Sequence, residues 1–327
     1  KLMWDYLSDN GFIQIETPIL IKSTPEGARD YIVPSRIHTG SFYALPQSPQ
    51  QLKQTLMVAG FERYFQIARC FRDEDLRSDR QPEHTQLDLE MSFVHQDDVL
   101  TVVEALYTKI FNSVRPDLVI NTPFQRLTYD DAMNRFGSDK PDLRFGMEIE
   151  DLTDIVSESD ANVFRSVASE GGEIKGFSVS GCGNYGRKQT DVLIEKAKTL
   201  GAKGLVFIAI NEGEGSVDSI TESEVKGPLN RFLSIEVIKN IASRTGSERG
   251  DLILIVADEK KKTTEILGNL RNYMGERLGL KNPNHCVFTW VTDFPLFEWD
   301  DDSQKWGAAH HVFSAPKEED IKYIETD

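Results

Sequence analysis

The chain has 327 residues, a length that predicts two domains. Hydrophobic residues make up 39% and charged residues 28%, which is typical of a soluble globular protein and too apolar for disorder. No apolar run approaches the ~20 residues that span a bilayer, so we expect no membrane-spanning helix and no membrane partner. The net charge of −16 excludes a protein that holds nucleic acid by global positive charge, although one local basic strip stays compatible with it.

Cysteine usage and the start of the chain bear on where the protein works. Cys70, Cys182 and Cys286 are odd in number and form no CxxC, so the sequence predicts neither a disulfide framework nor a zinc site. The chain begins inside a helix-like apolar run at residues 2–7, without an initiator Met or a signal peptide. We therefore expect a fragment cut at both ends, from a protein of the cytoplasm.

A helix that carries candidate binding residues is predicted to begin near residue 48. Ser48 suits the N-cap, Pro49 suits the first helical position and Gly60 suits the stop. Gln50 and Lys53 then share one face of the first turn. Because a helix N-terminus favours anions, Lys53 is a candidate ligand for a carboxylate or phosphate, and a merely solvated lysine is the alternative.

Two segments with alternating apolar and polar residues, 64–74 and 86–94, predict strands. Paired antiparallel, they would bury one side and show polar side chains together on the other. These polar residues are Gln66, Arg72, Glu74, Asp88 and Glu90. The connection carries Arg77 and Arg80 and is long for a hairpin, which indicates a functional loop.

This polar face has two interpretations. An arginine fork holds a carboxylate or phosphate bidentately, and carboxylates on the partner strand suit an ammonium group or a metal. The face therefore suits a small zwitterion beside a nucleotide phosphate. A surface lattice of salt bridges would explain the same residues, and composition leaves both interpretations open.

Residues 181–186 spell Gly-Cys-Gly-Asn-Tyr-Gly, a literal GxGxxG between a predicted strand at 176–180 and a predicted helix at 188–200. That context is the one a dinucleotide-binding fingerprint requires. The region has too few strands for a doubly wound sheet, so we favour glycines that make a tight strand-to-helix turn. We expect NADH not to bind.

Beyond residue 259 the sequence predicts one long amphipathic helix and then an aromatic strand at 287–291. His310 and His311 follow. Consecutive side chains of a strand point to opposite faces, so one histidine can face a pocket, whereas a two-histidine metal site is excluded.

Several motifs together resemble the class II aminoacyl-tRNA synthetases. Residues 71–74 (FRDE), a long loop and residues 86–93 resemble their motif 2, and residues 11–20 (GFIQIETPIL) resemble motif 1, which lies at their dimer interface. Further runs narrow the resemblance to bacterial-type aspartyl-tRNA synthetases. They lie at residues 24–31, 47–50, 80–83 and 293–295, and His310 and His311 follow at a fitting place.

The resemblance implies an α+β fold in which an antiparallel sheet flanked by helices is interrupted by an inserted α/β domain. Its expected parts are a first catalytic segment at 1–144, a GAD-like insertion at 145–256 and a continued catalytic segment at 257–327. It implies an aspartate–tRNA ligase that uses ATP and Mg²⁺, forms a homodimer through motif 1, and charges tRNA(Asp), with tRNA(Asn) left open. A non-catalytic paralogue, or a nucleotide-binding module on the same fold, is the alternative.

The resemblance also assigns roles to single residues, with Arg72 as the catalytic residue bridging the aspartate carboxylate and the α-phosphate. Aspartate would contact Glu26, Gln50, Lys53, Arg72, Asp88, His310 and His311. ATP would contact Arg72, Glu74, Gln81 and His84. His84 departs from the family, which usually has a phenylalanine under the adenine. No anticodon-binding domain and no motif 3 are found in the chain, so we expect it to be an incomplete enzyme with unknown metal ligands.

Overall fold

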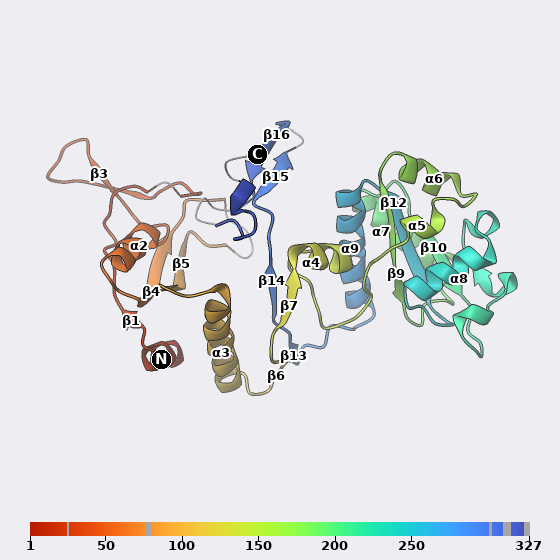
Figure 1. Ribbon diagram of the computed structural model, residues 1–327, viewed down its shortest axis with the longest axis horizontal. Coiled ribbons are helices and arrows are strands. Elements are labelled where there is room, and N and C mark those ends of the chain that lie inside the picture. The colour runs from red at the N-terminus through yellow and green to blue at the C-terminus, as the bar shows by residue number, and fades with distance from the viewer. Residues whose placement is uncertain (25, 76–79, 301–302, 310–314, 324–327) are drawn as a thin grey trace. The chain divides into compact units, whose positions relative to one another are not determined.

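The structure is a computed structural model that describes residues 1–24, 26–75, 80–300, 303–309 and 315–323 (Figure 1). Two compact units make up the chain, residues 1–118 and residues 119–327. Helices and largely antiparallel sheets occur together, which confirms the predicted α+β class. The three-part division at 144/145 and 256/257 stays a prediction. Within the described residues no helix is long and apolar enough to cross a membrane.

The first unit combines one three-stranded sheet, one short hairpin and three helices within its described residues. The helices are α1 (Leu2–Asp9), α2 (Gln50–Val58) and α3 (Gln96–Val114). The sheet has the order β1-β4-β5, with β1 (Ile13–Gln14), β4 (Arg63–Phe71) and β5 (Glu83–Met91), and the hairpin pairs β2 (Ile32–Pro34) with β3 (Phe42–Ala44).

The two predicted strands exist as β4 and β5, and their antiparallel pairing is confirmed. Their predicted bounds were wrong at the loop end. Arg72 and Glu74 lie beyond β4, because the backbone N–H of Asp73 turns away to donate to Arg29 O at 3.0 Å. At the other end β5 stops at Met91, and Phe93 adopts a φ of 57° that no strand tolerates.

Alternation along β4 and β5 separates an apolar face from a polar face, as predicted. The apolar face packs Phe65 against Leu7 of α1, Phe12 and Leu106 of α3. The polar face carries the register pair of Gln66 and Asp88, with Glu90 two residues on. The core below thus fixes the position of the charged groups above.

Helix α2 begins one residue later than predicted. Pro49 is its N-cap rather than its first residue, and Gly60 after its end has the left-handed φ of 96° that the predicted stop requires. Ser48 was wrongly predicted as the cap, since it precedes that position. Its hydroxyl accepts the backbone N–H of Gln50 at 3.3 Å and also donates to Glu26.

The second unit holds a five-stranded sheet in the order β11-β10-β12-β9-β8, antiparallel at every pairing. Its strands are β8 (Glu150–Asp151), β9 (Glu173–Val179), β10 (Val206–Ile210), β11 (Val225–Lys226) and β12 (Leu252–Asp258). The helices are α4 (Tyr129–Phe136), α5 (Thr153–Val156), α6 (Asn162–Ser169), α7 (Arg187–Thr199), α8 (Ile235–Arg244) and α9 (Lys260–Arg277). Short 3-10 turns cover Val217–Ser219, Glu222–Glu224, Asn230–Phe232 and Ile321–Tyr323.

Helices cover both faces of this sheet, with α7 and α9 on one side and α5, α6 and α8 on the other (Figure 1). Leu193, Leu267 and Leu254 belong to the first buried layer, whereas Phe164, Ile241 and Ile253 belong to the second. Because successive residues of β12 point to opposite faces, Ile253 and Leu254 enter different cores. The long helix predicted from residue 259 is α9, and it packs on β9 and β12.

Three two-stranded pairs complete the second unit. β6 (Val119–Ile120) pairs with β13 (His285–Cys286) and β7 (Gln125–Thr128) pairs with β14 (Thr289–Thr292), both in parallel. β15 (Phe297–Asp300) and β16 (Lys305–Ala308) form an antiparallel hairpin. The predicted aromatic strand at 287–291 therefore exists as β14, shifted by one to two residues.

The glycines of residues 181–186 lie in a strand–turn–helix between β9 and α7, as the sequence predicted. β9 is antiparallel to its neighbours, unlike the parallel sheet of a dinucleotide-binding fold. A Cβ on Gly183 would stand 2.2 Å from Ile210 O and 2.7 Å from the carbonyl carbon of Gly250. Close backbone packing therefore explains this glycine without a ligand, while the absence of NADH binding stays a prediction.

Arg271 of α9 is fully buried and holds the segment that leads into β8. Its guanidinium donates to the backbone oxygens of residues 142, 145, 146 and 147 at 2.8–3.2 Å. The guanidinium carbon also lies 4.3 Å from the ring centroid of Phe145 and 4.9 Å from that of Phe136. Burial lowers the pKa of Arg271 to about 10, so the side chain stays charged at neutral pH.

Candidate active site

The polar face of β4 and β5 forms the floor of the candidate site. Gln66 and Asp88 face each other across the strands and both are buried. The Gln66 Oε1 accepts the Tyr64 hydroxyl at 2.7 Å and the Thr17 hydroxyl at 3.1 Å. Burial, and then the charge of Asp88, raise the pKa of Tyr64 above its ordinary value, which keeps the phenol a donor. The floor is thus a fixed polar network around one carboxylate.

One lysine and two carboxylates form the charged centre of this floor. Lys53 Nζ, which reaches down from α2, lies 2.9 Å from Asp88 Oδ1 and 3.2 Å from Glu90 Oε2. Gln86 Nε2 donates to the same Asp88 Oδ1 at 3.2 Å. The second oxygen, Asp88 Oδ2, is buried and has no hydrogen-bond partner among the described residues. Since buried carboxylate oxygens require donors, this cluster has a place for one further cationic or N–H group.

Thr24 and residues 26–30 are held against the start of α2. Glu26 accepts the Ser48 hydroxyl at 3.2 Å and 3.1 Å through its two carboxylate oxygens, and the Thr24 hydroxyl at 3.3 Å. These contacts place the Glu26 carboxylate beside the helix N-terminus, which stabilises an anion there.

Arg72 lies just after β4. Its backbone N–H donates to Pro82 O at 2.8 Å, which continues the ladder by one residue, and its Nε donates to Gln47 O at 3.4 Å. In the described part of the chain this is the one hydrogen bond of its guanidinium, which leaves the terminal nitrogens for a bidentate anion.

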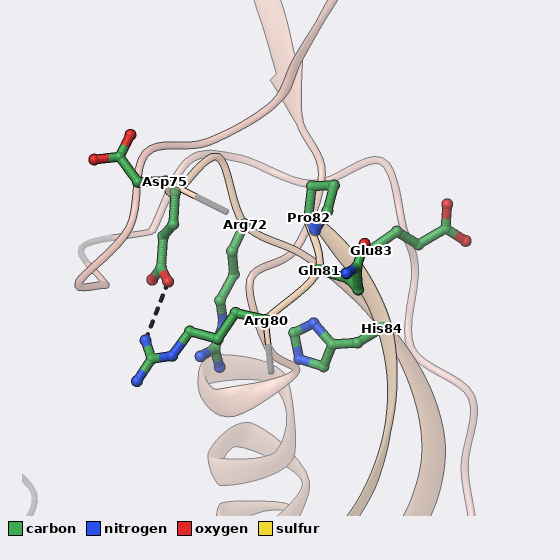
Figure 2. Close-up of a pocket in the computed structure, with 8 residues that line it drawn as sticks. Arg72, Asp75, Arg80, Gln81, Pro82, Glu83 and His84 are labelled. Carbon is green, nitrogen blue, oxygen red and sulfur yellow. Dashed lines mark hydrogen bonds and ion pairs between the residues drawn. The ribbon is translucent and has the colours of Figure 1, made fainter. Parts of the chain in front are cut away.

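Arg72 borders a cavity of about 350 Å³, within the size range of small-molecule sites (Figure 2). The lining residues are Arg72, Glu74, Asp75, Arg80, Gln81, Pro82, Glu83 and His84. Arg80 NH1 pairs with Glu74 Oε2 at 3.3 Å across it. Figure 2 shows the side chains of Arg72, Arg80 and His84 on one side, whereas the carboxylates of Asp75 and Glu83 point away. Two guanidinium groups beside an imidazole ring suit a phosphate attached to an aromatic base.

The structure brings most of the predicted site residues into these two neighbourhoods. The predicted ATP contacts Arg72, Glu74, Gln81 and His84 all line the cavity. Lys53 and Asp88 meet on the floor, with Gln50 at the first position of α2 above them. His310, His311 and Arg77 lie outside the described residues. The role of each of these residues stays a prediction.

Sequence reasoning missed Gln47 and Tyr64 as parts of the site. Gln47 is buried and hydrogen-bonds Ala28 and Asp30, and Tyr64 is buried beside Gln66. The alternation of β4 predicts which face Tyr64 occupies but not that its hydroxyl is needed there. A buried glutamine between two prolines carries no periodic signal, so only its place in the run at 47–50 pointed to it.

Metal ligands are a separate question. No group of three or more His, Cys, Asp or Glu side chains that could hold a metal ion occurs among the described residues. The ligands of the predicted Mg²⁺ therefore stay unknown.

Comparison with known proteins agrees with this geometry. The family described as "tRNA synthetases class II (D, K and N)" matches residues 1–326. The chain belongs to this family. Its relatives include an "Aspartate--tRNA(Asp/Asn) ligase" of Dehalococcoides mccartyi strain CBDB1, which is 53% identical over 327 residues, covering 100% of the chain and 55% of that protein.

Two further class II relatives show the same partial coverage. The "Aspartate--tRNA(Asp/Asn) ligase" of Caldanaerobacter subterraneus subsp. tengcongensis is 53% identical over 323 residues, covering 99% of the chain and 53% of the relative. The "Aspartate--tRNA ligase" of Ruminiclostridium cellulolyticum is 50% identical over 327 residues, covering 100% and 54%. The chain thus spans about half the length of the curated relatives that it matches.

Proposed function

We propose that this chain forms the part of an aspartate–tRNA ligase that binds L-aspartate and ATP and makes aspartyl-adenylate. The single observation that carries the proposal is the buried Asp88, whose Oδ2 has no partner among the described residues although Lys53 Nζ lies 2.9 Å from its other oxygen. An amino acid brings both an ammonium group for that oxygen and carboxylates for the lysine. The names of the relatives identify aspartate as that amino acid.

Binding of aspartate must rearrange the ion pairs that Lys53 forms in the free site. In the free site Asp88 and Glu90 share the single positive charge of Lys53, so one negative charge is left without a counter-charge in this cluster. When the substrate ammonium approaches Asp88 Oδ2, it takes over part of this neutralisation. Lys53 can then turn a proton toward the substrate side-chain carboxylate, since an ammonium has three donors. The floor thus recognises both charges of a zwitterion.

The chemistry requires positioning and charge stabilisation from the protein. One oxygen of the substrate α-carboxylate attacks the α-phosphorus of ATP, the bond to the β-phosphate oxygen breaks, and pyrophosphate leaves. Arg72 contacts the entering carboxylate and the α-phosphate, where charge accumulates in the transition state. A ribose hydroxyl at the 3′ end of tRNA(Asp) then attacks the carbonyl carbon, and AMP leaves.

The proposal extends to assembly and partners. Motif 1 exposes Ile13, Ile19 and Leu20, each at 45% exposure or more, which supports a homodimer that buries this edge. We expect Mg²⁺ to accompany ATP and the protein to work in the cytoplasm. Some relatives are named "Aspartate--tRNA(Asp/Asn) ligase" and another "Aspartate--tRNA ligase", so aminoacylation of purified tRNA(Asp) and tRNA(Asn) decides the second acceptor.

The test is aspartate-dependent exchange of pyrophosphate into ATP by the complete natural protein that contains this chain. We expect exchange with aspartate and at least ~10³-fold less with asparagine, because a site with polar partners rejects a mismatched analogue strongly. Binding of ATP without exchange would instead support the non-catalytic alternative.

A further inference from the structure

Gln47 contacts both the segment 26–30 and Arg72, two parts of the proposed site. Its side chain is 2% exposed and points to the segment 26–30, its backbone oxygen accepts Arg72 Nε at 3.4 Å, and its neighbour Ser48 donates to Glu26. The residue therefore stands between the Glu26 carboxylate, which the family resemblance assigns to aspartate, and the Arg72 guanidinium proposed to meet the phosphate.

The carboxamide of Gln47 uses every donor it has. Its Nε2 donates to Ala28 O at 2.7 Å and to Asp30 Oδ1 at 2.6 Å, and its Oε1 accepts the Ala28 backbone N–H at 3.0 Å. A side chain that binds both backbone groups of one residue acts as a short piece of β-ladder. It thereby fixes a segment that otherwise has few backbone partners.

The same segment reaches the catalytic arginine by a second route. Arg29 forms an isolated antiparallel bridge with Asp73, whose backbone N–H donates to Arg29 O at 3.0 Å. The Asp30 carboxylate also accepts the Ser23 hydroxyl. If Gln47 released Ala28 and Asp30, Glu26 and Arg72 would keep their chemistry but lose their fixed separation.

We propose that Gln47 is a positioning residue that couples the 26–30 segment to Arg72, so that Glu26, which the resemblance assigns to aspartate, and the phosphate-binding Arg72 are in place together. This inference rests on the proposed function for its kinetic part. It assigns to Gln47 no contact with substrate. Its effect on the reaction passes through Glu26 and Arg72.

The test compares Gln47→Met with Gln51→Met in the complete natural protein. Both variants exchange a carboxamide for a side chain of similar length, and Gln51 is exposed on α2. We expect Gln47→Met to raise the KM for aspartate about tenfold or more and to lower kcat less, since a mobile segment reduces the competent fraction. The KM for ATP and the melting temperature should change little, and Gln51→Met should resemble the wild type.

A second readout needs no activity. Amide hydrogen exchange at Ala28 and Asp73 should accelerate in Gln47→Met, whereas the amides of β4 and β5 keep their protection.

Three outcomes would overturn the inference. These are an aspartate KM equal to that of Gln51→Met, a uniform loss of stability with both KM values raised alike, and unchanged exchange at Ala28. A wild-type protein without any aspartate-dependent exchange would contradict the proposed function instead, and the exchange rates at Ala28 and Asp73 would still decide whether Gln47 holds the segment.

Discussion

The first unit buries the cation Lys53 and the second buries Lys175 and Arg271; of these, Lys53 and Arg271 are bonded in opposite ways. Lys53 contacts two side-chain carboxylates, one of which keeps a buried oxygen without a partner among the described residues. Arg271 donates instead to four backbone carbonyls through Nε and NH2 and lies against two aromatic rings. Among the described residues it forms no ion pair, and its buried NH1 has no hydrogen-bond partner. The backbone carbonyls bonded to Arg271 can move away from it only if their segment unfolds. The side-chain carboxylates bonded to Lys53 can instead bind a second cation without a change in the backbone.

The difference separates a structural charge from a functional one. Burying Arg271 costs desolvation of its charge, and its hydrogen bonds to the backbone oxygens fix the geometry of residues 142–147. Lys53 has partners that a zwitterionic ligand can share. The comparison therefore predicts that substitutions near Lys53 alter substrate recognition, while substitution of Arg271 alters stability.

The largest expected effect tests the functional side of the comparison. In the complete natural protein, Arg72→Ala should lower aspartate-dependent pyrophosphate exchange by ~10³-fold, because it removes a charge-assisted contact made to the transition state. The melting temperature should stay near that of the wild type, since the guanidinium has one hydrogen bond in the described part of the chain. Exchange within tenfold of wild type would show that the proposed role of Arg72 is wrong.

Arg271→Met tests the structural side. We expect it to lower the free energy of unfolding by at least ~3 kcal/mol, because four backbone carbonyl oxygens lose the charged donor that this buried side chain supplies. Urea denaturation followed by circular dichroism measures the change. Arg277→Met is the matched control, since Arg277 lies exposed on the same helix and bonds the Tyr273 hydroxyl at 3.1 Å. Equal destabilisation by both variants would contradict the distinction.

Lys53→Met sharpens the comparison at the cation that should be functional. We expect the ratio of kcat/KM for aspartate to kcat/KM for asparagine to fall by ~10-fold or more, because the substrate side-chain carboxylate loses its positive partner. Pyrophosphate exchange with each amino acid measures this ratio. ATP binding should weaken much less. Lys22→Met, at an exposed lysine of the same unit, is the control and should leave the ratio unchanged. An unchanged ratio in Lys53→Met would assign discrimination to another group.

The smallest effect concerns a half-buried ion pair outside both centres. Hydrogen bonds from Arg249 and then from Thr221 lower the pKa of Glu224 to about 2. Because the folded pKa lies below the unfolded value, the carboxylate stabilises the fold above about pH 4.5, and this contribution is lost as the pH falls toward 2. Glu224→Gln should flatten the dependence of the urea midpoint on pH in that window. The exposed Glu222→Gln should flatten it less, and equal slopes would refute the assignment.

Local patterns predicted the elements of the fold well where one periodicity dominates. The alternation in β4 and β5, the stop of α2 at Gly60 and the long α9 all follow from neighbours in sequence. The end of β4 did not, because Asp73 pairs with Arg29, more than forty residues away. The spacing around Gly183 likewise predicted a strand–turn–helix but not the antiparallel direction of the sheet.

The candidate site divides in the same way. Parity along the strands is sufficient to place Gln66, Asp88 and Glu90 on one face, and the family resemblance adds Glu26 and the cavity residues. Neither source indicates that Lys53 is already paired inside the free site. Ion pairs between α2 and β5 depend on how a helix packs over a sheet, which no sequence window contains.

The bonds of Arg271 have a topological consequence. They join backbone oxygens near residue 146 to a side chain 125 positions later. The segment that leads into β8 and helix α9, which follows β12, therefore lie next to each other. A stretch of chain with adjacent ends can be acquired or deleted in a single genetic event, because a connection of a few residues closes the gap. One arginine thus ties the segment at residues 142–147 to helix α9.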